Sequence, residues 1–151
     1  MTHVGIEAHY QKGPFWLATE QIYTKIESIE YDDPSFSSLF VQASWIVNGA
    51  SRPYVKRSGI FGVLRPRKTV TERGAGLIEL GARYSRVDLN GGRVRGGEMS
   101  RLSGIANWYL TRGALASFNY GRVRLDEPVP PSRETRVGTT HLFQLRLFLL
   151  F

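Results

Sequence analysis

The sequence contains no cysteine, which excludes a small secreted fold held together by disulfides. It also has no run of 18 apolar residues, which excludes a transmembrane helix. Convincing helical periodicity is missing, whereas glycine is abundant, with 16 residues in a chain of 151. A chain of this length forms one domain or part of one. The expected class is therefore all-β.

The first residues lack both the basic segment and the apolar core that a signal peptide requires. An exported protein needs such a leader. We therefore expect either that a leader has been removed or that the sequence begins partway through a longer protein.

Alternation of apolar and polar residues predicts seven long strands, with one further short strand possible at residues 59–64. The seven are expected at residues 3–11, 15–27, 38–48, 75–89, 101–110, 114–125 and 141–151. Tight turns at residues 12–14 and 111–113 alternate with longer loops around Asp32, Gly91 and Pro130. We read Gly96 and Gly97 as part of the Gly91 loop. Short turns at one end and long loops at the other are typical of an outer-membrane barrel.

The chain ends on a strongly apolar strand, which places His141, Phe143, Leu145, Leu147, Leu149 and Phe151 on one face. The opposite face carries Gln144 and Arg146 near its middle. Such a strand suits a barrel with lipid outside and water inside, although a core strand of a soluble sandwich has the same pattern. Aromatic residues gather near strand ends, as in a membrane-interface girdle, or else as core aromatics of a soluble β-protein: Phe15, Trp16, Trp45, Tyr84, Trp108, Tyr109, Tyr120 and Phe151.

Several stretches, taken in order, resemble the phosphate-selective porin O and P family. Each stretch alone is weakly specific, but the ordered series runs from about Gly5 to Phe151. The stretches are residues 49–54, 59–67, 76–86, 87–89, 107–110, 119–120 and 143–147.

The resemblance implies a trimeric, sixteen-stranded barrel in the outer membrane of a Gram-negative bacterium, through which phosphate or other small anions diffuse passively without a cofactor. It covers only the C-terminal part of such a barrel. We therefore expect residues 1–151 to be a single antiparallel β-barrel domain of about seven or eight strands that is N-terminally incomplete. Residues 59–64 offer an alternative, as an eighth strand closing a small structural barrel whose interior is filled by side chains.

The formal net charge of +7, with arginine far outnumbering lysine, suits a pore for anions and equally a soluble nucleic-acid-binding protein. In a pore, Arg83 and Arg146 are the best candidates to face the lumen and contact anions, because each lies mid-strand opposite an apolar face. A charge that faces lipid costs roughly 2–4 kcal/mol, so the inward side is favoured. Glu20 and Glu79 are candidates to pair with such arginines. The alternative is that these residues only brace the barrel wall.

Two further basic groups are expected near the two ends of the barrel. One lies in the connection 49–74 and either draws anions to the pore mouth or is a solvated turn: Arg52, Lys56, Arg57, Arg65, Arg67 and Lys68. The other lies near the opposite rim and either attracts anions, bridges lipopolysaccharide phosphates or is solvated: Arg93, Arg95, Arg101, Arg122, Arg124, Arg133 and Arg136.

Signals for an enzyme are poor. His3, His9 and His141 have no metal-ligand spacing, and Asp32 and Asp33 lack the pattern of a calcium loop. The glycine pairs lie between strands rather than before a helix, so they do not form a phosphate-binding fingerprint. We therefore expect no catalytic residue, metal or cofactor. The expected partners are small anions, outer-membrane lipid and lipopolysaccharide, with no nucleic acid.

Overall fold

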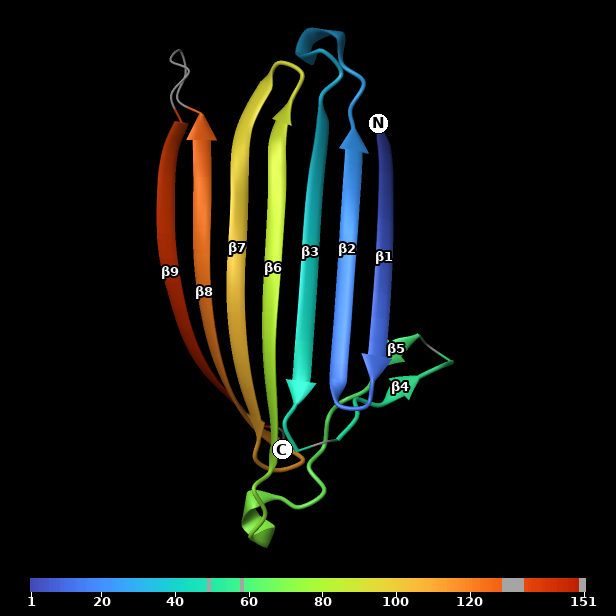
Figure 1. Cartoon of the computed structure of the whole chain (residues 1–151), viewed down its shortest axis with the longest axis vertical. Helices are drawn as coiled ribbons and strands as arrows, with labels where there is room; N and C mark the ends of the chain where they lie inside the picture. Colours follow the sequence, from blue (N-terminus) through green and yellow to red (C-terminus); the bar gives the residue numbers. More distant parts are fainter. Residues whose placement is uncertain (49, 58, 129–134, 150–151) are drawn as a thin grey trace.

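The computed structural model describes residues 1–48, 50–57, 59–128 and 135–149. Seven strands form one antiparallel sheet in the order β1-β2-β3-β6-β7-β8-β9 (Figure 1). The order follows the sequence, so each strand pairs with the next long strand along the chain. The strands are β1 (Thr2–Lys12), β2 (Phe15–Lys25), β3 (Ser35–Ile46), β6 (Leu77–Gly91), β7 (Val94–Tyr109), β8 (Ala114–Pro128) and β9 (Thr135–Leu149).

The seven predicted long strands are confirmed, but the short strand considered possible at residues 59–64 is not part of the sheet. Ile60–Phe61 (β5) pairs only with Tyr54–Val55 (β4), in a separate two-stranded sheet. The sheet is not closed: in the described part of the chain, β1 pairs only with β2 and β9 only with β8. These two edge strands run in the same direction (Figure 1).

Strand β7 begins at Val94 rather than at the predicted Arg101, because Gly96 and Gly97 belong to the strand and not to a loop. The pairing of β6 with β7 shifts register between Asp88 and Asn90, which marks a bulge. Gly97 has φ +84°, and a Cβ there would lie 2.7 Å from the carbonyl oxygen of Asp126 on β8. Glycine is required here because the β8 backbone packs closely against this position of the strand. A sequence pattern cannot distinguish a glycine of this kind from a glycine in a loop.

The predicted separation of short turns from long loops is only partly correct. The tight turns β1–β2 and β7–β8 lie at one end of the sheet, but the long connection between β3 and β6 lies at that same end (Figure 1). The opposite end has the loop between β2 and β3 and also the short turn between β6 and β7. We call the end with the β1–β2 and β7–β8 turns the turn end, and the opposite end the loop end. The terminal residues Leu150 and Phe151, and Arg133 in the loop before β9, lie outside the described residues.

Helical structure is limited to two 3-10 turns, η1 (Ile29–Tyr31) and η2 (Val70–Glu72). Among the described residues, no helix has the length and apolar character needed to cross a membrane. The β3–β6 connection is held at the turn end by a small apolar cluster, in which Leu64 packs with Ile46 and Leu77. Apart from this cluster, Ala18 is the remaining hydrophobic residue that is fully buried in the described chain.

Candidate functional site

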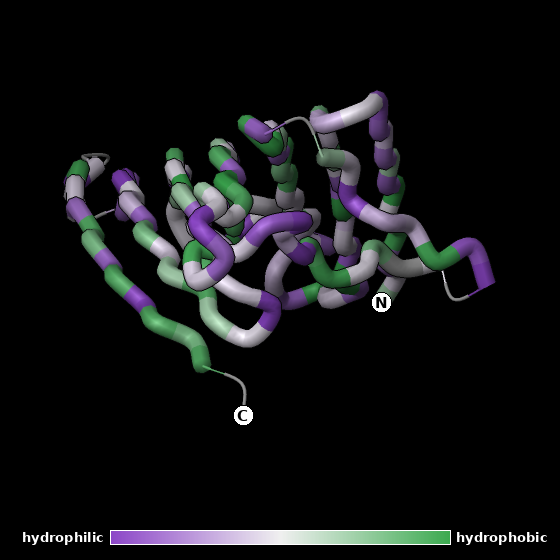
Figure 2. The backbone as a smooth tube through the Cα atoms, turned by 90° about the horizontal axis from the view of Figure 1, so that it is seen from below, coloured by the Kyte–Doolittle hydropathy of each residue, from purple (hydrophilic) through white to green (hydrophobic). Residues whose placement is uncertain are grey.

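The sheet has two chemically different faces, and the register of the strands decides which residue lies on which face. Residues directly opposite each other in an antiparallel pair share a face. Following the register from Glu79 across the sheet defines a polar face. The alternate strand residues form the apolar face, which carries charges toward the loop end, such as Arg86 and Arg124. Hydrophilic and hydrophobic residues alternate along much of β9 (Figure 2). The polar face includes Glu7, His9, Glu20, Gln42, Ser44, Arg83, Ser103, Asn107, Ser117, Asn119, Gln144 and Arg146.

The apolar face is not covered by any other part of the described chain. Leu80 and Tyr84 are each 41% exposed, and Leu145 is 79% exposed, whereas Glu79 on the other face is 4% exposed. Large exposed apolar surfaces are rare in soluble proteins, which bury such residues in a dry core. Along β6 this apolar segment, from Ile78 to Tyr84, rises about 20 Å, close to the height of roughly 25 Å of the apolar band of a membrane barrel.

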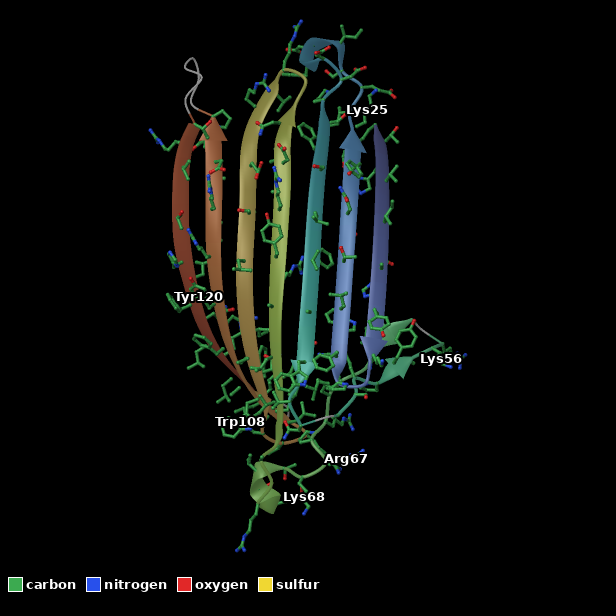
Figure 3. All side chains as sticks on the ribbon, in the orientation of Figure 1. Lys25, Lys56, Arg67, Lys68, Trp108 and Tyr120 are labelled. Atoms are coloured by element: carbon green, nitrogen blue, oxygen red, sulfur yellow. The ribbon has the colours of Figure 1, made fainter. Side chains whose placement is uncertain are left out.

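Aromatic residues gather at one margin of the apolar face. Toward the turn end, the rings of Phe15 and Trp45 stack with centroids 6.1 Å apart. Trp108, at the same margin, donates from Nε1 to the Ala75 carbonyl oxygen over 2.8 Å (Figure 3). Tyr84 and Tyr120 lie midway along β6 and β8 rather than near a strand end as predicted, and Tyr120 packs against Phe143 with ring centroids 5.1 Å apart. Amphipathic rings prefer the level of lipid headgroups.

Two further aromatics predicted for this girdle lie on the opposite face of the sheet. Trp16 and Tyr109 project from the polar face, because they share it with Ser44 and Glu79 through the strand register. Trp16 contacts Phe61 of the β4–β5 hairpin, with ring centroids 5.7 Å apart, and so helps to hold that hairpin against the sheet. Each directly follows an aromatic residue of the apolar face, Phe15 or Trp108, and composition near a strand end does not reveal the face.

Glu79 is the centre of a polar cluster at the turn end. Its carboxylate forms an ion pair with Arg52 and accepts hydrogen bonds from the Tyr109 hydroxyl over 3.0 Å and from Asn107 Nδ2 over 3.3 Å. Gln11 Nε2 donates to the Arg52 carbonyl oxygen over 2.8 Å, which fixes the backbone of that residue. The cluster therefore ties the β3–β6 connection to three strands of the wall.

Arg52 thus differs from the rest of the basic group in its connection. The other members are exposed at the turn end, where Figure 3 shows Lys56, Arg67 and Lys68. None of the cations in this remaining group forms an ion pair with a described residue: Lys56, Arg57, Arg65, Arg67 and Lys68.

Four strand residues were predicted to face the lumen: Glu20, Glu79, Arg83 and Arg146. The structure places all four on the polar face but does not join them into one group. The Arg83 guanidinium lies over the Phe40 ring, 4.1 Å from its centroid. Glu20 lines the same small hollow of about 160 Å³ as Arg83. Glu79 is bound to Arg52 rather than to Arg83. Arg146 lies on β9, separated from β6 by two strands, and is opposite Ser117.

A larger hollow of about 550 Å³ lies on the polar face over β3, β6 and β7. Arg101 lines it together with Arg83 and Arg52, although the sequence placed Arg101 near the rim. The misplacement follows from the predicted start of β7, since a strand that begins at Val94 makes position 101 a mid-strand one. The order polar, apolar, polar at Arg101, Leu102 and Ser103 could have indicated that Arg101 lies on the polar face.

The three histidines serve local contacts. His3 Nδ1 and His141 Nδ1 lie within hydrogen-bond distance of the Thr24 and Tyr120 hydroxyls, at 2.8 and 2.9 Å, and the His9 ring packs against Trp16. No group of three or more potential metal ligands occurs among the described residues.

Comparison with known proteins gives two similarities. The sequence pattern of the family described as phosphate-selective porin O and P matches residues 2–151. A protein of Caulobacter vibrioides, described only as uncharacterized, is 29% identical over 119 residues. That alignment covers 79% of this chain and 24% of the relative, so the chain spans about a quarter of the relative's length.

Proposed function

The chain belongs to the phosphate-selective porin O and P family, and from this we propose that it forms part of the wall of an outer-membrane pore through which small anions diffuse passively, phosphate foremost. The family is one of outer-membrane porins in Gram-negative bacteria, which implies a channel rather than an enzyme. The observation that carries the proposal is the division of one sheet into an exposed apolar face and a polar face. A bilayer covers the first, and water fills the space beside the second.

In this proposal, selectivity comes from fixed positive charge on the polar face. Arg83 and Arg146 line the pathway, and each presents a planar set of N–H donors that suits oxyanions. Positive charge beside a narrow water path lowers the barrier for anions and raises it for cations. The exposed cations at the turn end raise the local anion concentration at that mouth.

The open sheet needs further strands to close. An unpaired strand edge in lipid leaves backbone groups unsatisfied, each at a cost of several kcal/mol. Because β1 and β9 run in the same direction, they cannot pair antiparallel with each other, and an odd number of added strands is required. We propose that nine strands from the rest of a longer protein complete a barrel of sixteen, and that three such barrels form a trimer.

The proposal is tested with the complete protein that carries this chain. We expect it in the outer-membrane fraction, and we expect its reversal potential in a planar bilayer under a KCl gradient to show anion selectivity. Arg83→Glu and Arg146→Glu should each shift that potential toward cations. The control, Arg122→Glu, changes the same charge on the apolar side of β8 and should shift it less.

Three outcomes would contradict the proposal. Release in a water-soluble form, with nucleic-acid affinity that falls steeply with salt, would support the soluble alternative. Membrane insertion without ion current would support a purely structural barrel. Cation selectivity in the unaltered protein would reject the role of the arginines.

A further inference from the structure

The apolar face of the sheet changes its chemistry abruptly toward the loop end. On three adjacent strands, β6, β7 and β8, the apolar segment ends at Tyr84, Leu102 and Tyr120, the last of which is labelled in Figure 3. The next residues on the same face, two positions farther along each strand, are polar: Arg86, Ser100 and Arg122. Guanidinium groups therefore lie directly at the border of the apolar surface.

The charges beyond this border follow one order along the strands. On β6, Arg86 comes before Asp88, and on β8, Arg122 and Arg124 come before Asp126. The arginines are thus nearer to the apolar segment, and the carboxylates are nearer to the loop end. The headgroup of a phosphate-bearing lipid has the matching order, because its phosphate lies next to the acyl chains and its counter-ions lie farther out.

Arg122 is the arginine of this border that is most open to a ligand. It is exposed, and it forms no ion pair with a carboxylate of the described residues. In the strand register it is opposite His141, whose Nδ1 lies 2.9 Å from the Tyr120 hydroxyl. A guanidinium, an imidazole and a phenol therefore lie close together at the edge of an apolar surface, where a headgroup finds several hydrogen-bonding partners.

Arg86 and Arg124 are held at the same level by ion pairs. Arg86 Nη2 pairs with Glu98 and Arg124 Nε pairs with Asp126, and the two arginine side chains are 49% and 55% exposed. Ion pairs as exposed as these contribute little to stability, so they exchange partners readily. Each pair draws its arginine away from the apolar segment and leaves further N–H groups of the guanidinium available to a phosphate.

From this order we propose that Arg122, with Arg86 and Arg124 beside it, binds the phosphate of a membrane lipid at the loop-end border of the apolar face. The inference rests on the proposed function insofar as the sheet spans a bilayer, but it concerns the outside of the wall and not the pore. The sequence placed Arg122 and Arg124 near this rim, and the strand register adds their outward direction.

The chemistry of the border favours a lipid over a second copy of the chain. A planar guanidinium binds two phosphate oxygens at once, and the acyl chains of the same molecule cover the apolar residues next to it. A second copy packed on this face would take the unpaired Arg122 out of water, which is costly unless that copy supplies a carboxylate. The order of charges also matches a headgroup without any rearrangement of the wall.

The test measures how lipid A, which carries two phosphates, raises the unfolding temperature of the complete protein in detergent. A ligand that binds the folded state raises this temperature. We expect a saturable rise with lipid A, a much smaller rise with dephosphorylated lipid A, and none with inorganic phosphate. Arg122→Gln should raise the lipid A concentration that gives half of the rise by about tenfold, which corresponds to losing a charged hydrogen-bonding partner.

Arg136→Gln is the matched control, because it removes the same charge at the same end of the sheet but from the polar face of β9. It should leave the half-rise concentration unchanged. Arg122→Lys should give a value between those of Arg122→Gln and the unaltered protein, because it keeps the charge and loses the planar group. Gel mobility without heating shows that each variant has folded.

The inference is overturned if Arg122→Gln and the unaltered protein have the same half-rise concentration, or if Arg136→Gln has an equal effect. It is also overturned if dephosphorylated lipid A or inorganic phosphate acts as well as lipid A. Separation of subunits in Arg122→Gln with an unchanged lipid response would assign the border to a second copy instead. Anion selectivity of the unaltered protein in a planar bilayer tests the proposed function separately, since lipid binding on the outside does not require a conducting pore.

Discussion

At the scale of single residues, the ion pair between Arg52 and Glu79 is the most constrained feature of the polar face. The Glu79 side chain is 5% exposed and that of Arg52 is 22% exposed. A buried carboxylate that loses its partner keeps the cost of leaving water without compensation. The pair therefore fixes where the connection crosses the sheet.

We expect Arg52→Ala to destabilise the folded protein by about 3 kcal/mol, because it leaves Glu79 unpaired. The measurement is the temperature at which the complete protein unfolds in detergent, followed by gel mobility. Arg57→Ala removes an exposed cation from the same connection and should have little effect. Equal unfolding temperatures for the two variants would show that the pair contributes nothing to stability.

Sequence reasoning succeeded at this scale where alternation is strict and failed where contacts are distant. The faces of Glu79 and Arg83 follow from their alternation with Ile78, Leu80 and Tyr84 along β6. The partner of Glu79 does not follow from any local pattern, since Arg52 comes from a connection without regular repeats. Arg101 was misplaced because two glycines looked like a loop.

A second residue-scale feature lies in η2, where a capping box joins Thr69 and Glu72. The Glu72 carboxylate accepts hydrogen bonds from the Thr69 backbone N–H and hydroxyl, each over 2.9 Å. These bonds, the backbone one foremost, lower the pKa of Glu72. Because the folded-state pKa lies below the unfolded one, the stabilisation is present above the unfolded pKa and disappears as pH falls through the folded pKa.

We therefore expect the Thr69 amide to be protected from hydrogen exchange at neutral pH and to lose that protection in acid, after correction for intrinsic exchange rates. Glu72→Gln should remove most of the pH dependence, because the amide has no charge to titrate. A pH dependence that survives in Glu72→Gln would assign it to another group.

At the scale of elements, the long strand β7 depends on glycine at its bulge. Gly96 and Gly97 lie where β6, β7 and β8 approach closely, with a Cβ at Gly96 placed 2.7 Å from the Leu89 Cβ. Bulges of this kind increase twist and bend the strand. The sequence predicted that β6 and β7 exist but not that β7 continues through the glycines, because loops and bulges share the same composition.

We expect Gly97→Val to destabilise the loop end by roughly 1–3 kcal/mol, because a β-branched residue must adopt φ +84° against the β8 backbone. Protease cleavage near the β6–β7 turn in the folded protein measures this effect. Gly104→Ala in the same strand is the control, since nothing lies within 4 Å of a Cβ there. Similar cleavage of both variants would contradict the role of Gly97.

At the scale of the whole molecule, the sheet has one layer and almost no dry interior. The described chain fully buries only four hydrophobic side chains: Ala18, Ile46, Leu64 and Leu77. The alternation predicted this division into two faces. The family resemblance predicted the lipid bilayer in which a sheet with an exposed apolar face is stable. The further strands proposed to close the barrel lie beyond what any pattern within these 151 residues can position.

Neighbouring residues of β8 separate the two faces in one experiment. We expect Phe118→Arg to reduce insertion strongly, since a cation facing lipid costs about 2–4 kcal/mol, whereas Asn119→Arg should insert normally because it faces water. The folded fraction in outer membranes, measured by gel mobility without heating, compares them. Normal insertion of Phe118→Arg would place that face away from lipid.

The nearly coreless sheet also bears on the time between synthesis and insertion. A soluble domain buries its apolar residues as it collapses, but the described part of this chain has no second layer that could cover them. In an aqueous compartment its apolar side would attract other copies and aggregate. We therefore expect the chain to stay dispersed in water only when a detergent or another protein covers that apolar side.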